Sequence, residues 1–373
     1  MKELLGHLER WQAAGKRAAI ARVVDVAGSG PRDPGAAMAV NEDGEIVGSV
    51  SGGCVEGAVV EAAQEALATN EAALITFGYS DDDAFAVGLT CGGTIQLFVE
   101  PFGYDDEVHR RLEAALRDGD AAVLATVITG PNTGAKLFQA VGSAAVGGLG
   151  DLGLDEAVRR DAAGELAAGT TRVRHYGMQG EAWREDVTVF IESFVPPAQM
   201  IIFGAIDFSA ALSQVANVVG FRVTVCDARP AFATPARFPL AHEVVADWPQ
   251  RYLGKVGADL TARDAICILT HDPKFDVPAI VAALETNVGY IGVMGSRRTH
   301  RERVARLLEA GVDGDGVARL HSPIGLDLGA RTPEETAISI CAEIISTRAG
   351  RHEVLPLALT DGAIHGAAAD IRS

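Results

Sequence analysis

The fold is decided by the stretch Met200-Ile201-Ile202-Phe203-Gly204, a short apolar run that ends at a glycine. A helical pattern follows over 209–219, and a second apolar run, 221–225, ends at Asp227. The same alternation continues along the chain to Thr332-Pro333-Glu334-Glu335, which has the sequence of a capped helix start. Strands that alternate with helices predict a doubly wound parallel sheet.

The turn after the first of these strands departs from the fingerprint of dinucleotide-binding proteins. Ile206 stands where the backbone would approach a pyrophosphate, and Ser209 stands where a third glycine is expected. Asp207 adds negative charge at a helix end that would otherwise attract phosphate. Asp227 is the acidic residue expected after the second strand. The layout therefore predicts the fold, while the turn argues against bound NAD(P).

Composition and charge restrict the class of protein. The chain has 373 residues, of which 48% are hydrophobic and 22% charged, so it has room for two or three domains of roughly 150 residues. The net charge of −18 argues against nucleic acid and anionic membranes as general partners. Five widely spaced cysteines without a CxxC pair indicate a reducing compartment. No apolar run is long enough to span a membrane and the first residues lack a signal peptide's apolar core, so we expect a cytoplasmic protein.

Pro196-Pro197 marks the expected boundary between a domain of residues 1–196 and a domain of residues 197–373. Within the first domain, 18–24 is similar to 122–128, and 61–68 is similar to 161–168. This similarity suggests an internal repeat made of residues 1–103 and 104–196. The second copy has no cysteine, so the cysteine-bearing loops are interpreted as functional additions to a shared scaffold.

The first of these loops is Gly48-Ser49-Val50-Ser51-Gly52-Gly53-Cys54-Val55-Glu56, which precedes a helical pattern. It predicts Cys54 at or near a helix N-terminus, where free N–H groups and the helix dipole favour the thiolate. A second cysteine flanked by glycines occurs in Gly88-Leu89-Thr90-Cys91-Gly92-Gly93. The alternative for such a cysteine is a small buried hydrophobic residue.

A candidate anion site occurs in the second half at Gly295-Ser296-Arg297-Arg298-Thr299. It follows a strand, opens a helix and combines two guanidinium groups with hydroxyl and N–H donors. In an open sheet such a loop lies at the carboxyl edge, where ligands bind. The alternative is a helix start with solvated arginines. Asp327, in the loop 322–329, is either a ligand contact or a loop cap.

These segments together resemble the XdhC/CoxI family, accessory factors of molybdenum hydroxylases such as xanthine dehydrogenase. The matching segments are 48–56, 88–93, 295–299 and 323–329. The resemblance implies an N-terminal α+β domain of the XdhC/CoxI type and a C-terminal Rossmann domain. It also implies that the chain binds molybdenum cofactor, or molybdopterin, transiently and assists its sulfuration and insertion. The expected partners are a molybdenum hydroxylase apoenzyme and a cysteine desulfurase.

On this interpretation Cys54 and Cys91 are the reactive residues, and they either contact molybdenum or carry sulfur. The residues assigned to cofactor binding are Ser51, Gly52, Gly53, Glu56, Gly92, Gly93, Gly295, Ser296, Arg297, Arg298 and Asp327. The two cysteine-bearing turns are expected to face one pocket that the second half helps to enclose. The chain would then be a cofactor-maturation chaperone, expected as a homo-oligomer, rather than an independent enzyme. Two alternatives stay open: an NAD(P)-dependent oxidoreductase that uses the second half, and a non-catalytic bridging protein.

Overall fold

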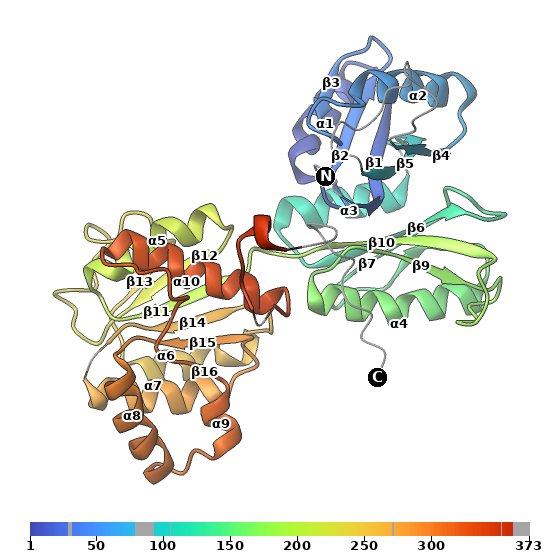
Figure 1. The fold of residues 1–373 in the computed structure, drawn as a ribbon. Coiled ribbons are helices and arrows are strands. Elements are labelled where there is room, and N and C mark those ends of the chain that lie inside the picture. The colour runs from blue at the N-terminus through green and yellow to red at the C-terminus, as the bar shows by residue number, and fades with distance from the viewer. Residues whose placement is uncertain (29–31, 79–92, 105, 271, 352, 361–373) are drawn as a thin grey trace. The chain divides into compact units, whose positions relative to one another are not determined.

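The computed structural model describes residues 1–28, 32–78, 93–104, 106–270, 272–351 and 353–360. The chain forms two compact units (Figure 1). Unit 1 comprises Met1–Pro196 with the segment that begins at Leu357, and unit 2 comprises Pro197–Pro356. Among the described residues, no helix is long and apolar enough to cross a membrane.

The first sheet of unit 1 has five antiparallel strands in the spatial order β3-β2-β1-β5-β4. Its strands are β1 (Ala18–Ala27), β2 (Ala37–Asn41), β3 (Ile46–Gly48), β4 (Ala73–Phe77) and β5 (Thr94–Pro101). Its helices are the 3-10 turn η1 (Lys2–Leu4), α1 (Leu5–Ala13) and α2 (Glu56–Thr69). Along the chain the order is therefore helix, three strands, helix and two strands.

The second sheet of unit 1 has the same construction, in the spatial order β8-β7-β6-β10-β9. Its strands are β6 (Ala122–Thr129), β7 (Lys136–Ala140), β8 (Val146–Gly147), β9 (Arg172–Tyr176) and β10 (Val187–Phe194). Its helices are α3 (Glu107–Asp118) and α4 (Leu152–Ala168). Each element thus has a counterpart in the first set, and below we call the two sets copy 1 and copy 2.

Each sheet of unit 1 packs against a long helix on one face and against the other sheet of unit 1 on its opposite face. Helix α2 packs on the first sheet, and α4 packs on the second. On the opposite faces the two sheets share an apolar cluster that contains Val24, Phe98, Ile128 and Phe190. In Figure 1, α2 and α4 accordingly lie on the outer sides of the pair of sheets.

Four buried charged residues also join the two sheets. Arg22 Nη1 donates to Glu100 Oε1 at 2.8 Å, and Arg22 Nε lies 3.6 Å from Glu192 Oε2. Lys136 Nζ, from the second sheet, donates to Glu100 of the first. All four side chains are buried. The two copies are therefore linked by ion pairs away from water, where the loss of one partner is costly.

The last residues of β3 and β8, Gly48 and Gly147, are subject to the same backbone constraint in the two copies. Gly48 and Gly147 both have φ of +83°. A Cβ on Gly48 would overlap the carbonyl oxygen of Ala37, and a Cβ on Gly147 would overlap that of Lys136. Both positions therefore require glycine for backbone shape and for space.

Gly48→Ala and Gly147→Ala are each expected to lower the free energy of unfolding by about 2–4 kcal/mol, from overpacking and an unfavourable φ. Denaturant unfolding of both variants measures this. Gly119→Ala is the control, because Gly119 has φ of +78° but, within the part of the chain that the structure describes, no atom lies within 4 Å of an added Cβ. It should cost only about 1 kcal/mol. Equal losses at all three positions would contradict the role of the close carbonyl contacts.

Unit 2 contains one parallel sheet in the order β13-β12-β11-β14-β15-β16. Its strands are β11 (Gln199–Phe203), β12 (Arg222–Cys226), β13 (Glu243–Val245), β14 (Ala265–Ile268), β15 (Tyr290–Val293) and β16 (Leu320–His321). Its helices are α5 (Asp207–Val218), α6 (Pro249–Val256), η2 (Gly257–Asp259), α7 (Pro273–Leu284), α8 (Arg297–Glu309), α9 (Gly314–Ala318) and α10 (Pro333–Arg348). A last 3-10 turn, η3 (Leu357–Leu359), belongs to unit 1.

Helices cover both faces of this parallel sheet. Helices α5 and α10 pack on one face, and α6, α7 and α8 pack on the other. The doubly wound fold predicted from the sequence is confirmed. The predicted capping box at the start of α10 is also present, with Thr332 and Glu335 each bonded to the other's backbone N–H.

Candidate functional site

The loop between β3 and α2 is organised by the carboxylate of Glu56, the first residue of α2. Glu56 Oε1 accepts hydrogen bonds from Ser49 Oγ at 2.7 Å and from the backbone N–H of Ser51 at 2.9 Å. Glu56 Oε2 accepts from the N–H groups of Gly53 at 2.8 Å and Val55 at 3.2 Å, and from the Ser51 hydroxyl. One carboxylate therefore holds the whole loop at the start of the helix.

Cys54 lies just before the helix, because the adjacent Val55 is the N-cap of α2. Its side chain is half-buried and packs against the apolar cluster under α2. The neighbouring Gly52 and Gly53 are exposed, with φ of +72° and +117°, and an added Cβ on either would meet no atom of the described residues within 4 Å. Cys54 therefore stands at a helix start, as the sequence predicts, but the N–H groups of Gly53 and Val55 beside it donate to Glu56 and are not free as the sequence analysis expects.

Glu56→Gln is expected to destabilise the protein by about 1–2 kcal/mol near neutral pH, because an amide replaces a charged hydrogen-bond acceptor. Partial burial raises the pKa of Glu56, but hydrogen bonds from Ser51 and Ser49 outweigh burial and lower the pKa to about 2. The folded-state pKa thus lies below the unfolded value of roughly 4.3. The stabilising contribution is therefore present above that value and is lost as the pH falls toward 2.

Unfolding free energies of the wild type and Glu56→Gln, measured near neutral pH and in acid, test this expectation. The difference between the two proteins should shrink in acid. A difference that does not change with pH would show that the charge of Glu56 does not stabilise the loop.

The loop between β8 and α4 repeats this geometry with different residues. Asp155 takes the place of Glu56 and accepts a hydrogen bond from the N–H of Leu149 at 2.7 Å. Gly153 takes the place of Cys54, and a Cβ there would lie only 2.6 Å from the carbonyl oxygen of Gln179. This second loop therefore has no room for a cysteine side chain without a backbone shift.

The structural pairing also corrects the sequence alignment of the two helices. The similarity between 61–68 and 161–168 is one residue out of register with the pairing of Glu56 and Asp155. Both helices are rich in alanine, so their sequences resemble each other at more than one shift. The backbone end points decide the register, because Asn70 and Gly169 both cap their helices in the left-handed conformation.

The other predicted residues of unit 1 are placed only in part. Cys91 and Gly92 lie outside the described residues, and Gly93 is buried immediately before β5. In the part of the chain that the structure describes, no group of three or more His, Cys, Asp or Glu side chains is placed to hold a metal ion. A shared site for Cys54 and Cys91 stays a prediction.

The predicted anion site of unit 2 is an exposed helix start. Ser296 caps α8 by accepting a backbone N–H on its Oγ at 3.1 Å. Arg297 Nη2 lies 3.8 Å from Asp327 Oδ2, and Arg298 Nε donates to Glu302 Oε1 at 3.0 Å. The structure thus brings Arg297 and Asp327 together. Any anion that binds these arginines must compete with two carboxylates that already neighbour them.

Beneath this segment lies a buried arginine that the sequence analysis missed. The Arg303 side chain is 2% exposed and donates to Asp276 at 3.1 Å and to Ser322 at 3.2 Å. An added Cβ on Gly295, which has φ of +152°, would lie 3.3 Å from its guanidinium. Arg303 therefore joins the first turn of α7 to the loops that follow β15 and β16. Leu307 lies four residues after Arg303 and is buried, so both residues are on the inner face of α8. The four-residue spacing from an apolar residue was the available sequence signal.

The turn after β11 differs from a typical phosphate-binding turn, as the sequence indicates. Ile206 is the N-cap of α5 without a side-chain cap, and the Asp207 side chain is 91% exposed. Ser209 is buried, and its hydroxyl donates to the carbonyl of Gly204. The side chain of Ser209 is therefore used inside the turn itself.

Asp227 is buried at the end of β12 and is held by protein groups. Its Oδ2 accepts from the N–H of Ala205 at 2.8 Å, and its Oδ1 accepts from Arg229 Nε at 2.9 Å. Burial raises the pKa of Asp227, but the hydrogen bonds from Arg229 and Ala205 outweigh it and lower the pKa below its ordinary value. Asp227 is therefore an ionised carboxylate that ties the β12 loop to the β11 turn.

Unit 2 has a cavity of about 430 Å³ at the carboxyl ends of β11, β12 and β14. It is lined by residues that include Gly204, Ile206, Asp227, Arg229, Thr270 and Lys274. Ligands of open α/β sheets bind at this edge. Arg229 and Thr270 were not predicted, although they closely follow β12 and β14, and Lys274, in the first turn of α7, was not predicted either.

Comparison with known families and proteins adds independent information. The family described as the XdhC Rossmann domain matches residues 200–344, and the XdhC and CoxI family matches residues 11–78. The chain belongs to the XdhC and CoxI family. The first-half match contains the loop around Cys54, and the second-half match contains Arg297 and Asp327. The resemblance noted from the sequence motifs is thereby confirmed.

Two relatives are similar over most of their length. A protein of Bacillus subtilis, described as a probable subunit of xanthine dehydrogenase, is 29% identical over 336 residues, which cover 89% of this chain and 94% of the relative. The molybdenum cofactor insertion chaperone PaoD of Escherichia coli is 26% identical over 348 residues, which cover 91% of this chain and 86% of PaoD. A crystal structure described as a xanthine dehydrogenase from Bacillus halodurans has 28% identity and a TM-score of 0.66, covering 94% of this chain and 96% of the other.

Proposed function

We propose that this XdhC/CoxI protein is an accessory factor of a molybdenum hydroxylase of the xanthine dehydrogenase type. In this role it binds molybdenum cofactor transiently and assists its sulfuration and insertion. The observation that carries the proposal is the Glu56 loop, which presents Cys54 at a helix start within the family match. The similarity to PaoD, a molybdenum cofactor insertion chaperone, supports the same role.

The chemistry of the Cys54 loop suits a sulfur contact rather than a phosphate contact. A thiolate is a soft ligand that matches molybdenum and sulfur chemistry. The N–H groups of Ser51, Gly53 and Val55 already bind the Glu56 carboxylate, whose charge would repel a phosphate. We therefore assign Cys54 to the molybdenum or sulfur end of the cofactor. Arg297 and Arg298 of unit 2 are proposed separately as an anion-binding pair.

The partners follow from this role. A hydroxylase apoenzyme would receive the cofactor, and a cysteine desulfurase would supply the sulfur that Cys54 and Cys91 carry or pass on. We propose that this takes place in the cytoplasm and that the protein acts as a homo-oligomer. The protein is then a chaperone that turns over no small substrate of its own.

Reconstitution of a purified hydroxylase apoenzyme with molybdenum cofactor tests the proposed function. Addition of this protein should raise the yield of active hydroxylase severalfold, whereas serum albumin at the same concentration should not. Equal yields with both would contradict the proposal. Titration with NADH and NADPH tests the oxidoreductase alternative, which tight binding with hydride transfer would favour.

A further inference from the structure

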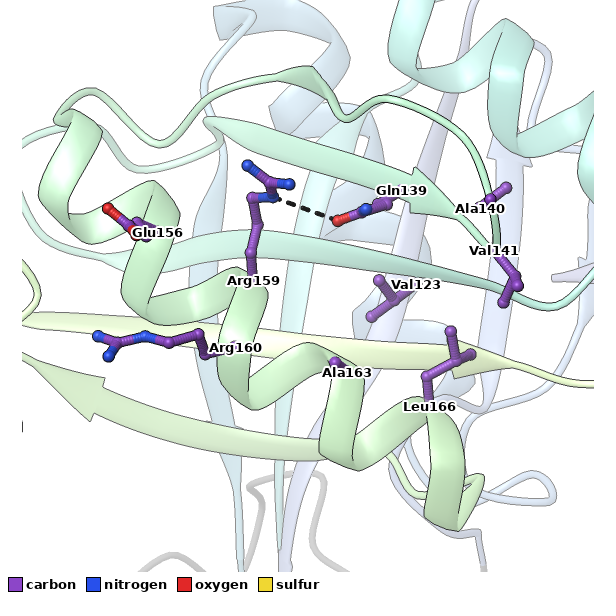
Figure 2. Close-up of a pocket in the computed structure, with 10 residues that line it drawn as sticks. Val123, Gln139, Ala140, Val141, Glu156, Arg159, Arg160, Ala163 and Leu166 are labelled. Atoms are coloured by element: carbon purple, nitrogen blue, oxygen red, sulfur yellow. Dashed lines mark hydrogen bonds between the residues drawn. The ribbon is translucent and has the colours of Figure 1, made fainter. Parts of the chain in front are cut away.

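The outer face of copy 2 carries a groove between the end of β7 and helix α4 (Figure 2). The groove has a volume of about 480 Å³. Its floor and walls include the apolar residues Val123, Val141, Ala163 and Leu166. Val141 is 70% exposed, so its side chain offers apolar surface to a ligand rather than to the core. A groove of this volume is large enough to hold several side chains of another molecule.

The matching place in copy 1 is crossed by an arginine. Arg17 precedes β1, and its Nη1 donates to the carbonyl of Leu67 near the end of α2 at 2.9 Å. Its Nε donates to Glu42 Oε2 at 3.2 Å, so one side chain joins the helix to the hairpin after β2. This space is therefore occupied in copy 1 by the chain itself.

Copy 2 lacks both members of that clamp. Backbone hydrogen bonds identify the matching residues of the two copies. The N–H of Glu42 donates to the carbonyl oxygen of Arg17 at 3.0 Å, and the N–H of Val141 donates to the carbonyl oxygen of Ala121 at 2.9 Å. The two bonds are equivalent in the two copies, so Ala121 replaces Arg17 and Val141 replaces Glu42. The groove of copy 2 thus lies where copy 1 has an ion pair at the protein surface, and Val141 there offers apolar side-chain surface in place of Glu42.

The rim of the groove carries two arginines, Arg159 and Arg160, and one glutamate, Glu156, so its net charge is positive. Arg159 and Arg160 are exposed on consecutive positions of α4, and among the described residues neither has a carboxylate partner within ion-pair distance. Arg159 Nε donates to Gln139 Oε1 at 3.3 Å, which holds its guanidinium over the groove (Figure 2). Two adjacent guanidinium groups at one groove favour an acidic ligand, although Glu156 on the same rim offsets part of their charge.

We propose that this groove docks a segment of a partner protein in which carboxylate side chains alternate with aliphatic ones. The aliphatic side chains would cover Val141, Ala163 and Leu166, and the carboxylates would pair with Arg159 and Arg160. Charge complementarity is the reason for this choice, because guanidinium groups bind carboxylates in a paired geometry. The inference concerns protein recognition by copy 2, and it does not depend on whether Cys54 binds molybdenum cofactor.

The test uses the full chain and a fluorescent peptide of the sequence Leu-Glu-Leu-Glu-Leu with blocked ends. Binding is followed by fluorescence anisotropy and mapped by NMR of the backbone amides. Three variants are compared: Ala121→Arg/Val141→Glu, which copies the copy 1 clamp; Arg159→Gln/Arg160→Gln, which removes the charges; and Arg110→Gln/Arg111→Gln, a matched pair of exposed arginines on α3. Thermal unfolding of each variant confirms that it is folded.

The proposal expects the peptide to shift amide signals at 139–142 and 156–166. Both groove variants should weaken binding about tenfold or more, and the α3 pair should not change it. A peptide with Gln in place of Glu should also bind about tenfold more weakly. The proposal is overturned by no binding at peptide concentrations of about 5 mM, where even weak docking is detectable. Equal binding of the Gln peptide, shifts elsewhere on the chain, or a groove used only for self-association in sedimentation experiments would also overturn it.

Discussion

Arg22→Leu is expected to lower the free energy of unfolding by about 3–5 kcal/mol, because it leaves buried carboxylates without their cation. Arg22 is 1% exposed and lies 2.8 Å from Glu100 Oε1 and 3.6 Å from Glu192 Oε2. Lys136 remains beside Glu100, so Glu192 bears most of the loss. Denaturant unfolding followed by far-UV circular dichroism measures the change.

The pH dependence of this variant has a definite sign. Burial already raises the pKa of Glu192, and Arg22 opposes that rise. Removal of Arg22 should raise the pKa further, so the folded variant binds a proton that the unfolded chain releases. The variant is then least destabilised at a pH below the pKa that Glu192 has in the unfolded chain. Its loss of unfolding free energy grows as the pH rises toward and through the pKa that Glu192 has in the folded variant.

The double variant Arg22→Leu/Glu192→Leu is the matched control. It removes the unpaired charge together with its partner, and apolar pairs can replace buried ion pairs at little cost. It should recover at least half of the loss caused by Arg22→Leu alone. Additive losses, or a single-variant loss below about 1 kcal/mol, would show that the ion pairs do not hold the two copies together.

Cys54→Ser is expected to reduce hydroxylase activation by about tenfold or more, because a serine hydroxyl is neither a soft ligand nor a carrier of sulfur. The fold should survive, since the Cys54 side chain is only half-buried and the Glu56 hydrogen bonds remain. We expect a stability change below about 1 kcal/mol. The measurement is hydroxylase activity after reconstitution with equal amounts of wild type and variant.

Cys341→Ala controls for the general loss of a cysteine. Cys341 is buried in α10 of unit 2, and burial raises its pKa to about 11, so it stays a thiol. Its replacement should leave activation unchanged. Equal activation by Cys54→Ser and wild type would remove Cys54 from the proposed chemistry, while equal losses in both variants would point to instability instead.

The sequence predicts unit 2 well because its signals are local. Each buried strand is a short apolar run, and the start of α10 has all the residues of a capping box in four positions. The position of Cys54 before α2 follows from the change of pattern at Gly52-Gly53 in the same way. Such features depend on neighbours in the chain and are readable without coordinates.

The residues that sequence reasoning missed depend on distant partners. Arg22 occurs in a strand whose other residues are mostly apolar, and its partner Glu192 comes from another sheet. Arg303 is one of several arginines of α8, and only the fold shows that it turns inward to Asp276. The groove beside α4 likewise depends on Ala121, a residue with no chemistry of its own. Only the three-dimensional structure shows which charged residues pair with each other. The same holds for a space that is open because a residue such as Ala121 is small.

The most direct test of the central claim is co-purification of molybdenum cofactor with the protein. The wild type and the variants Cys54→Ala, Cys91→Ala and Cys54→Ala/Cys91→Ala would be produced in cells that synthesise the cofactor, then assayed for molybdenum by metal analysis and for pterin by fluorescence. Our account predicts molybdenum and pterin in equal amounts with the wild type, and the loss of both from the double variant while unfolding stability is kept. Wild-type protein free of both, or a double variant that retains as much of each as the wild type, would contradict it.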